Sequence, residues 1–432
     1  MKKPKKNFWE ERSRMSNIPK LRFPEFKGEW EEKKFYEVFD ILQNNTFSRD
    51  QLNNENGIVR NIHYGDVLIK YGDYIDCQKE KLPFINLENN LSKYEDTSYV
   101  KNGDIIIADT AEDYTAGKVS EICNVKDYKI LSGLHTFLCR TKFEFASKFL
   151  GYKLNSGSYH NQIAPLVAGT KVYSINRKAI GETTITYPSK AEQQKIADFL
   201  SNVDSIITAE TKILNTLQKK KKALMQKLFT QQLRFKSADG TDFPAWEEST
   251  LEKECDYVDY RGKTPKKVST GIFLVTAKNI KLGYIDYECS KEYIAENDYN
   301  EVMHRGKVKL GDVLITTEAP CGNVAQIDNE NVALAQRVIK YSSKGRLNNT
   351  FLKYYFLSDL FRTIINEKAT GSTVKGIKGS VLHKQKVIVP CLAEQQKIAD
   401  CLSSLDSLIQ TQQKVVTAWQ QRKKALLQQM FV

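Results

Sequence analysis

The chain has 432 residues, 41% hydrophobic and 27% charged, and lysine plus arginine (65) outnumber aspartate plus glutamate (52). This length allows two or three domains with sizeable cores, and the formal charge of +13 favours a polyanionic partner such as nucleic acid. No apolar run is long enough to cross a bilayer, and the cysteines and histidines form no CxxC pair or dense cluster. We therefore expect a soluble, cytoplasmic protein with reduced thiols and no metal site.

The first domain is expected over residues 15–188, after a disordered arm or extension at 1–14 to which no role is given. The runs DIIIAD (104–109) and ETTITYP (182–188) are short, β-branched and bounded by polar residues or proline, so they predict strands. Apolar residues at helical spacing over 148–163 predict helix. The segment is therefore predicted to be a mixed α+β domain of ordinary size.

A long spacer helix is predicted over 189–232. Ser189 and Glu192 stand at the spacing of a capping box, which would start the helix. Apolar residues then repeat every seven positions and predict a coiled-coil seam. Glu210 and Lys221 interrupt this seam, as polar residues that fix register do. The predicted seam consists of Ile196, Leu200, Val203, Ile207, Leu214, Leu217 and Leu224.

The second domain is expected over 233–390, with strands at 311–317 and 385–390 and helix at 350–368. A second spacer helix follows over 391–432, with Gln412 and Lys423 at the interrupting positions. Cys391 replaces the capping Ser189, so we expect a weaker cap at this helix start. The second seam consists of Ile398, Leu402, Leu405, Ile409, Val416, Trp419 and Leu426.

The two halves are copies of one unit. AEQQKIAD occurs at 191–198 and again at 393–400, and residues 191–229 share 21 of 39 positions with residues 393–431. The segments between such anchors differ, as expected for two binding domains with different targets on a shared frame. Twofold pseudosymmetry would pair the helices antiparallel. The predicted fold class is thus α+β, with two pseudo-symmetric globular domains separated by two long antiparallel coiled-coil helices.

Small, mostly uncharged residues such as Ser201, Thr208, Ser403 and Thr411 flank the predicted seam, where a solvated two-stranded coil would carry charges. Two interpretations stay open. Helices of other proteins could dock on these flanks, or the two spacer helices could simply approach each other closely.

Several segments resemble a known family, the specificity subunits of type I restriction-modification systems. They are LRFPEFKGEWEE (21–32), the AEQQKIAD helices, YRGKTP (260–265), GDVLI (311–315) and AQRV (335–338), in the order domain, helix, domain, helix. The resemblance implies two target recognition domains, each reading one half of a bipartite, asymmetric site in double-stranded DNA. It also implies partners: two methyltransferase (modification) subunits and restriction/translocase subunits. S-adenosylmethionine, ATP and Mg would be needed only in those partners, and this chain would hold no cofactor and no catalytic site.

Two other classes of function remain as alternatives. An enzyme with its own methyltransferase or nuclease activity would need motifs that are absent here: the chain has no Pro-Pro and no phosphate-binding GxxxxGK[ST] loop. Glu31 and Lys33 form an ExK fragment, but no aspartate precedes them to complete a metal site. A purely structural coiled-coil adaptor would bind protein without preferring any DNA sequence.

Loops that mix cations with amides or aromatic rings are the predicted DNA contacts, because cations neutralise phosphates while other polar groups read base edges. For each single residue, a solvated loop side chain is the alternative. The predicted set is Lys171, Tyr173, Asn176, Arg177 and Lys178 in the first domain, and Tyr260, Arg261, Lys263, Lys266, Lys267, Thr373, Lys375 and Lys378 in the second.

Overall fold

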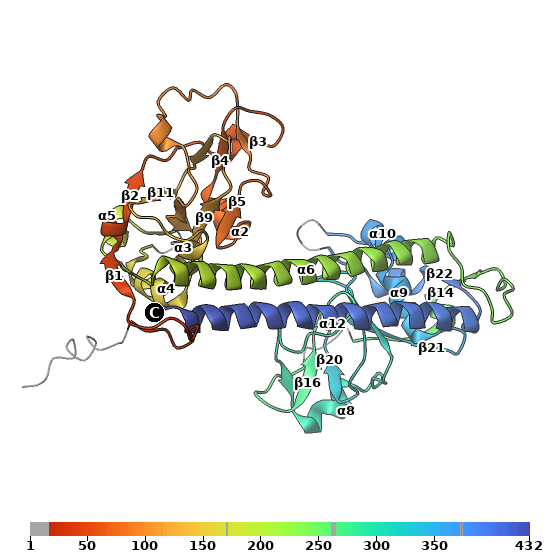
Figure 1. Cartoon of the computed structure of the whole chain (residues 1–432). Helices are drawn as coiled ribbons and strands as arrows, with labels where there is room; N and C mark the ends of the chain where they lie inside the picture. Colours follow the sequence, from red (N-terminus) through yellow and green to blue (C-terminus); the bar gives the residue numbers. More distant parts are fainter. Residues whose placement is uncertain (1–16, 114, 170–171, 261–264, 372, 374) are drawn as a thin grey trace, which may run out of the picture. The chain divides into compact units, whose positions relative to one another are not determined.

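The computed structural model of the chain describes residues 17–113, 115–169, 172–260, 265–371, 373 and 375–432 (Figure 1). Its contacts divide it into two compact units. Unit 1 comprises Met1–Glu210 and Val415–Val432, and unit 2 comprises Thr211–Lys414. Both boundaries fall inside the long helices α6 (Lys190–Phe229) and α12 (Leu392–Met430). Each unit therefore holds one α+β domain together with one stretch of each helix.

Unit 1 is built on short strands and short helices that precede α6. Its strands are β1 (Glu31–Lys34), β2 (Phe39–Leu42), β3 (Leu52–Asn53), β4 (Arg60–Ile62), β5 (Tyr74–Asp76), β6 (Phe84–Ile85), β7 (Ile105–Ala108), β8 (Thr110–Ala111), β9 (Val119–Cys123), β10 (Ile130–Ser132), β11 (Thr136–Thr141), β12 (Tyr173–Ser174) and β13 (Thr184–Tyr187). Its helical segments before α6 are α1 (Phe35–Val38), η2 (Arg49–Gln51), α2 (Tyr64–Ile69), η3 (Asp96–Ser98), α3 (Phe149–Leu154), α4 (Gly157–Ile163), η4 (Ala164–Leu166) and α5 (Arg177–Gly181).

Two larger sheets organise unit 1, with strand orders β2-β11-β7-β9-β5 and β10-β4-β6-β3. Strands β7 and β9 are buried along their whole length. This agrees with the apolar sequence of β7, whereas β9 also buries Ser120 and Glu121. The pairs β1-β13 and β12-β8 complete the strand pairing. The predicted strands at 104–109 and 182–188 are confirmed as β7 and β13.

Unit 2 repeats this construction with fewer strands. Its strands are β14 (Glu247–Thr250), β15 (Cys255–Asp259), β16 (Ile272–Val275), β17 (Tyr293–Ile294), β18 (Val313–Thr316), β19 (Val324–Gln326), β20 (Val332–Leu334), β21 (Val338–Ser343) and β22 (Lys386–Val389). Its helical segments before α12 are α7 (Leu251–Glu254), η5 (Glu296–Asp298), α8 (Tyr299–Val302), α9 (Asn349–Leu357), α10 (Asp359–Lys368) and α11 (Gly379–His383).

The sheet orders of unit 2 correspond strand by strand to those of unit 1. The order β15-β21-β18-β19 matches β2-β11-β7-β9, and β14-β22 matches β1-β13. The order β17-β16-β20 matches β6-β4-β10, with a parallel pair in the same place in each unit. The predicted strands at 311–317 and 385–390 are confirmed as β18 and β22. Strands β3, β5, β8 and β12 have no counterpart among the strands described in unit 2.

The helical segments predicted at 148–163 and 350–368 are each two helices. The break falls at Ser156 in unit 1 and at Ser358 in unit 2, and both residues have extended backbone (φ −68°, ψ 154° and φ −66°, ψ 149°). Each serine hydroxyl donates to a carbonyl three residues back, at 2.6 Å. Local hydrogen bonding by serine competes with helix continuation, and apolar spacing alone does not register it.

The two long helices run antiparallel in each unit. In unit 1, the first turns of α6 pack with the last turns of α12, because Ile196, Leu200 and Met430 share one buried core. Lys423 Nζ of α12 lies 2.5 Å from Asp204 Oδ1 of α6 and 2.6 Å from Asp73 Oδ2. The antiparallel direction follows, because moving forward along α6 from Ile196 to Asp204 means moving back along α12 from Met430 to Lys423.

The helices of unit 2 pair in the same way. Met225 and Leu228 of α6 share a core with Ile398 and Leu402 of α12, and Lys221 Nζ lies 2.5 Å from Asp406 Oδ1. Lys221 and Lys423 are the predicted interruptions of the seam, and each forms an interhelical ion pair. Every predicted seam residue is buried or half-buried in its own unit.

The repeated octapeptide joins each long helix to its own domain. Gln193 accepts a hydrogen bond from the Ala146 amide at 3.0 Å, and Gln395 accepts one from the Asn348 amide at 2.7 Å. Ile196 and Ile398, three residues later, are buried in the core of their respective domains. Gln193 and Gln395 of the two octapeptides are therefore fixed by tertiary hydrogen bonds.

Glu192 does not have the role predicted for it. Both of its carboxylate oxygens accept from the Arg22 guanidinium, at 2.7 and 2.8 Å, in place of the expected bond back to the helix start. Glu394 is held in the same way by Arg234, at 3.1 and 2.7 Å, and also by Trp246 Nε1 at 2.9 Å. The capping-box prediction is corrected accordingly: a buried carboxylate that can form a bidentate pair with arginine takes the stronger interaction.

Equivalent aromatic clusters fill the base of each domain. In unit 2, Phe229 at the end of α6 packs on Phe351 with ring centroids 5.7 Å apart. In unit 1, Phe431 follows the end of α12 and packs on Phe149 at 5.9 Å and on Trp30 at 6.2 Å. The last turns of α12 thus occupy in unit 1 the place that the end of α6 occupies in unit 2.

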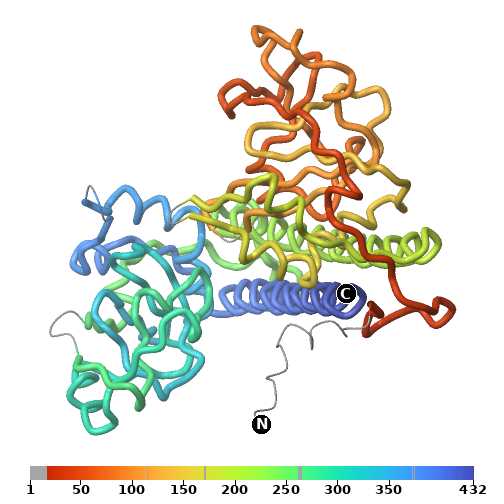
Figure 2. The backbone as a smooth tube through the Cα atoms, turned by 90° about the vertical axis from the view of Figure 1, so that its left-hand side faces the viewer, coloured from red at the N-terminus to blue at the C-terminus, as the bar shows by residue number. Residues whose placement is uncertain are grey.

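The N-terminal segment of unit 1 passes beside the end of α12 (Figure 2). The Leu21 amide donates to the Gln429 carbonyl at 2.9 Å, and the Leu233 amide donates to the Lys227 carbonyl at 3.1 Å in unit 2. These two bonds are equivalent in the repeat. Unit 1 is therefore assembled from both ends of the described chain, whereas unit 2 is formed by one continuous segment.

Candidate nucleic-acid interface

A short hairpin leaves the same place in each domain. In unit 1 it is closed by the bridge between Ala168 and Ser174, and in unit 2 by the bridge between Thr370 and Gly376. Each closing pair is equivalent in the repeat. The sequences enclosed, GTKVY at 169–173 and GSTVK at 371–375, differ at most positions. The chain thus presents two different loops on one frame.

Glycine at the first loop position is required by the backbone. Gly169 has φ +141° and Gly371 has φ +118°, values that side chains with a Cβ rarely adopt. A Cβ atom on Gly169 would lie 1.9 Å from the Val172 carbonyl oxygen. Both loops therefore start at a glycine whose backbone conformation disfavours other residues.

Two further segments reach the same sheet edge as the hairpin in unit 1. Strand β2 ends at Leu42, opposite Leu138 of β11, and β11 starts at Thr136, opposite Ala108 at the end of β7. The hairpin joins this edge because the Ile175 amide donates to the Asp109 carbonyl at 2.9 Å. The segment after β2, the turn before β11 and the hairpin therefore converge.

The same convergence is present in unit 2. Strand β15 ends at Asp259, opposite Ile339 of β21, and β21 starts at Val338, opposite Thr316 at the end of β18. The Ile377 amide donates to the Thr317 carbonyl at 2.9 Å, the equivalent of the bond that fixes the first hairpin. Two of the segments predicted to bind DNA, at 259–267 and 371–380, thus start from one edge of one sheet.

The candidate residues of the first domain surround its hairpin. Tyr173 is half-buried in β12, and Asn176, Arg177 and Lys178 are exposed at the start of α5. Asn176 Oδ1 caps this helix by accepting from the Ala179 amide at 2.8 Å. The Arg177 guanidinium lies 5.6 Å from the Phe137 ring centroid. Lys171 lies outside the described residues.

The candidates of the second domain are divided between surface and core. Lys266, Thr373, Lys375 and Lys378 are exposed, and Lys267 forms an ion pair with Glu292 at 2.7 Å. Tyr260, in contrast, is 8% exposed, belongs to a buried apolar cluster and donates its hydroxyl to the Gly306 carbonyl. Its side chain is thus placed in the core, away from the surface where DNA contacts would form. Arg261 and Lys263 lie outside the described residues.

The segment after β2 was missed by sequence reasoning. It is the structural counterpart of the second domain's 259–267, and it carries the exposed residues Gln43, Thr46 and Arg49. Arg49 forms a bidentate pair with Asp66, at 2.8 and 3.0 Å. Nothing local marks this segment as a basic loop, because QNNTFSRD contains one arginine and no lysine.

A buried aspartate directly before β7 and another directly before β18 each form an ion pair within the domain. Asp104 accepts from the Lys101 amide at 2.7 Å and pairs with Arg140, also at 2.7 Å. Asp312 accepts from the Lys309 amide at 2.9 Å and pairs with Lys340 at 3.0 Å. These bonds explain the Gly-Asp of both motifs, KNGD and KLGD, as a turn closed by a charged side chain.

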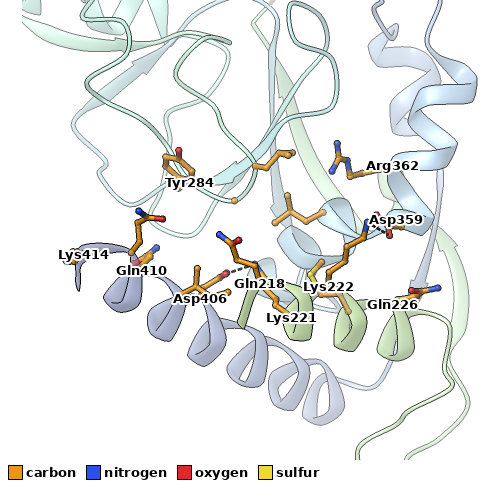
Figure 3. A pocket seen from close by; sticks show the side chains of 16 residues that line it. Gln218, Lys221, Lys222, Gln226, Tyr284, Asp359, Arg362, Asp406, Gln410 and Lys414 are labelled. Carbon is orange, nitrogen blue, oxygen red and sulfur yellow. Dashed lines mark hydrogen bonds and ion pairs between the residues drawn. The ribbon is translucent and has the colours of Figure 1, made fainter. Parts of the chain in front are cut away.

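Two lysines of the basic run at 219–222 on α6 form ion pairs within unit 2. A cleft of about 850 Å³ lies between α6, α12, α10 and residues 282–284. Figure 3 shows Lys221 directed to Asp406 and Lys222 directed to Asp359, with ion-pair distances of 2.5 and 3.6 Å. These two lysines of the run at 219–222 are therefore neutralised by side chains of their own unit.

No three His, Cys, Asp or Glu side chains of the described ranges are grouped so that they could hold a metal ion. None of the helices in the described part of the chain combines the length and hydropathy needed to cross a membrane.

Comparison with known proteins agrees with the duplicated architecture. The sequence model of the family described as "Type I restriction modification DNA specificity domain" matches residues 27–219 and again residues 244–418. A type I restriction enzyme specificity subunit of Methanocaldococcus jannaschii, MjaVIII, is 26% identical over 396 residues, covering 83% of this chain and 90% of that protein. The EcoKI specificity subunit of Escherichia coli is 24% identical over 293 residues, covering 62% of this chain and 61% of that protein.

Solved structures share the fold. The S subunit of a type I restriction-modification system from M. genitalium aligns with a TM-score of 0.55 and 16% identity, covering 96% of this chain and 99% of that one. A chain from a structure of the type I R-M system aligns with a TM-score of 0.53 and 17% identity, covering 92% and 96%. With the family model matching both halves, this chain belongs to the specificity subunits of type I restriction-modification systems.

Proposed function

We propose that this chain is the DNA-reading subunit of a type I restriction-modification complex and that each domain recognises one half of a bipartite, asymmetric site. One observation carries the proposal: the converging hairpin, turn and strand-end segment are built twice on the same frame with different sequences. Base contacts made from such loops would give the two halves different specificities. The long helices would set the unread gap between the halves.

In this proposal the chain itself is not catalytic. It would position two methyltransferase (modification) subunits, and in the restriction complex also the restriction/translocase subunits. S-adenosylmethionine, ATP and Mg²⁺ would act only in those partners. Support comes from family membership and from the sequence, which has no phosphate-binding loop or methyltransferase tetrapeptide.

Mapping of methyladenine tests the proposal. The chain is co-expressed with its cognate modification subunit in a host that lacks adenine methylation, and modified sites are read by sequencing. We expect one motif of two defined halves separated by a fixed run of unspecified bases. A continuous motif would contradict the two-domain reading, and the absence of any preferred sequence in competition gel shifts would favour a structural adaptor.

Loop replacement tests the assignment of halves to domains. Replacing residues 371–375 (GSTVK) by the first loop's GTKVY keeps the required glycine and changes the other contacts. We expect the second half-motif to change or relax while the first stays intact. The reciprocal exchange at 169–173 is the matched control and should affect only the first half. A change in both halves after either exchange would contradict the assignment.

A further inference from the structure

Two residues in the described chain share an uncommon backbone conformation at equivalent places. His135 has φ +53° and Arg337 has φ +73°, and they stand 202 residues apart in the aligned halves. Left-handed backbone at a residue other than glycine costs roughly 1–2 kcal/mol. Among the non-glycine residues of the described ranges with positive φ, these two form the pair that matches across the repeat.

The surrounding hydrogen bonds show that the two turns are built alike. The Asp109 amide donates to the His135 carbonyl at 3.1 Å, and the Thr317 amide donates to the Arg337 carbonyl at 2.9 Å. His135 stands directly before the first residue of β11, and Arg337 directly before the first residue of β21. Both therefore lie at the sheet edge where the hairpin, the turn and the strand-end segment converge. Both copies therefore keep a strained turn although the side chain at this position differs. Retained backbone strain of this kind is more typical of a functional site than of simple packing.

Both side chains are half exposed and lie beside polar groups of the neighbouring strand end. The His135 side chain is 48% exposed, and its Nδ1 lies 3.3 Å from Thr110 Oγ1 and 3.5 Å from Asp109 Oδ1. The Arg337 side chain is also 48% exposed, and its Nε lies 2.8 Å from Glu318 Oε1. Preorganisation by a carboxylate lowers the entropy lost when such a side chain contacts a ligand.

The orienting groups belong to the segments that hold the hairpins. Thr110, which donates to Asp109 Oδ1 at 2.7 Å, pairs with Ser174 of the first hairpin. Glu318 bridges to Gly376, the closing residue of the second hairpin. His135 and Arg337 are thus placed at the base of the two loops that carry predicted DNA contacts.

His135 has an aromatic neighbour in Tyr64. The two rings are nearly perpendicular, with centroids 5.3 Å apart, and the His63 ring lies 4.5 Å from Tyr64 at an interplanar angle of 36°. Burial lowers the pKa of His63, so its ring is neutral at neutral pH and its Nδ1 accepts from the Gly65 amide at 3.2 Å. His63 is used within the fold, whereas the His135 side chain is 48% exposed.

We propose that His135 and Arg337 are specificity-determining residues, each reading a base edge in the half-site of its own domain. The inference rests on the proposed function and adds one residue per domain, presented by the sheet frame and not by the hairpin. Arginine most often reads guanine through O6 and N7, and histidine offers a single donor or acceptor. Arg337 should accordingly specify a guanine in the second half-site.

Asparagine is the suitable substitution at both positions, because it tolerates left-handed backbone. We expect Arg337→Asn to lower discrimination at one base of the second half-motif by about 10-fold, with the first half-motif unchanged. His135→Asn should do the converse. Arg346→Asn is the control, since Arg346 is also half exposed (52%) and paired with carboxylates, those of Glu247 and the buried Glu254, but lies outside the converging edge. It should leave both half-motifs unchanged.

The outcomes distinguish failure of this inference from failure of the proposed function. A bipartite motif in the wild-type complex, with unchanged base preferences in both folded Asn variants, overturns the inference and leaves the proposed function intact. Absence of a bipartite motif in the wild type overturns the proposed function itself. A merely structural role would weaken binding at all sequences equally, so an equal loss at cognate and mismatched sites also counts against the inference. Should an Asn variant melt earlier than wild type, Arg337→His and His135→Arg provide a second test, with changed base preference in one half-motif expected from each.

Discussion

Two buried glutamates fix the starts of the long helices at the scale of single residues. Glu394 is fully buried, and its carboxylate is shared between Arg234 and the Trp246 indole. Glu192 and Arg22 repeat the pair in unit 1. A buried carboxylate paired in this way is strongly coupled to its arginine, because removing one partner leaves the other without compensation.

We expect Glu394→Gln to lower the free energy of unfolding of unit 2 by about 2 kcal/mol, because Arg234 would lose its charged partner. Urea denaturation followed by circular dichroism measures this loss. Glu248→Gln is the control: Glu248 pairs with Lys386, but both side chains are more than half exposed, so a loss below about 0.5 kcal/mol is expected. Equal effects of the two substitutions would show that burial of Glu394 has no energetic consequence.

Lys153 is a second buried charge with a measurable signature. Its Nζ lies 2.8 Å from Thr186 Oγ1 and 3.3 Å from Ser158 Oγ, and burial lowers its pKa from 10.5 to about 7. Between these values the unfolded chain binds one more proton at this residue than the folded chain. The free energy of unfolding should therefore rise with pH from about 7 toward 10 through this group.

We expect Lys153→Met to abolish this contribution. The unfolding free energy of the wild type, measured relative to the variant in urea at pH 7, 8 and 9, should increase at each step. The control is Lys190→Met, which removes an exposed lysine (59% exposed) in place of a buried one. A difference between wild type and Lys153→Met that does not change with pH would mean that Lys153 keeps its charge when the protein is folded.

At the scale of elements, the interhelical ion pairs provide a natural matched experiment. Lys423 in unit 1 bridges Asp204 and Asp73, whereas Lys221 in unit 2 pairs with Asp406. The two lysines are equivalent in the repeat, and each side chain is 18% exposed. Asp73 belongs to the loop before β5, a strand without a described counterpart in unit 2.

Lys423→Met should destabilise unit 1 by about 2–3 kcal/mol, because two partly buried carboxylates would lose their cation and repel each other. Lys221→Met should destabilise unit 2 by only about 1 kcal/mol, since one carboxylate is left. Thermal unfolding of both variants gives the comparison. Adding Asp204→Asn to Lys423→Met should restore part of the loss, and an equal effect of the two lysine substitutions would contradict the role of Asp73.

Elements with strong periodicity can be predicted from the sequence, whereas the tertiary partners of single side chains cannot. The seven-residue repeat from Ile196 gave the long helices, and the β-branched runs gave β7, β13, β18 and β22. Glu192 was assigned to a capping box because local spacing cannot reveal Arg22, which lies 170 residues earlier in the chain. Tyr260 was placed among DNA contacts for its basic neighbours, but its ring completes an apolar core.

The turns at the converging edge mark the limit of sequence reasoning about the interface. His135 lies in SGLHTF, which contains no other cation, and nothing local shows that its backbone is left-handed. Arg337 lies in AQRV, one of the segments by which the sequence resembles the family. The equivalence of the two positions appears only once the strand registers of both units are known.

At the scale of the whole molecule, α6 and α12 each contribute one stretch to unit 1 and one to unit 2. The ion pair of Lys423 with Asp204 and that of Lys221 with Asp406 fix the antiparallel register of the two stretches in their units. Lys212 is midway between Asp204 and Lys221 on α6, and Lys414 is midway between Asp406 and Lys423 on α12. Insertions after these two residues would therefore leave both ion pairs intact.

Inserting one seam-preserving heptad after Lys212 and another after Lys414 lengthens both helices by about 10 Å. Under the proposed function, this corresponds to about three base pairs of DNA at roughly 3.4 Å each. Methyladenine mapping should show both half-motifs unchanged and the gap between them longer by about that amount. A heptad in α6 alone is the control, since it shifts one helix against the other and should abolish methylation. If the double insertion left the gap unchanged, the helices would not determine the spacing of the half-sites.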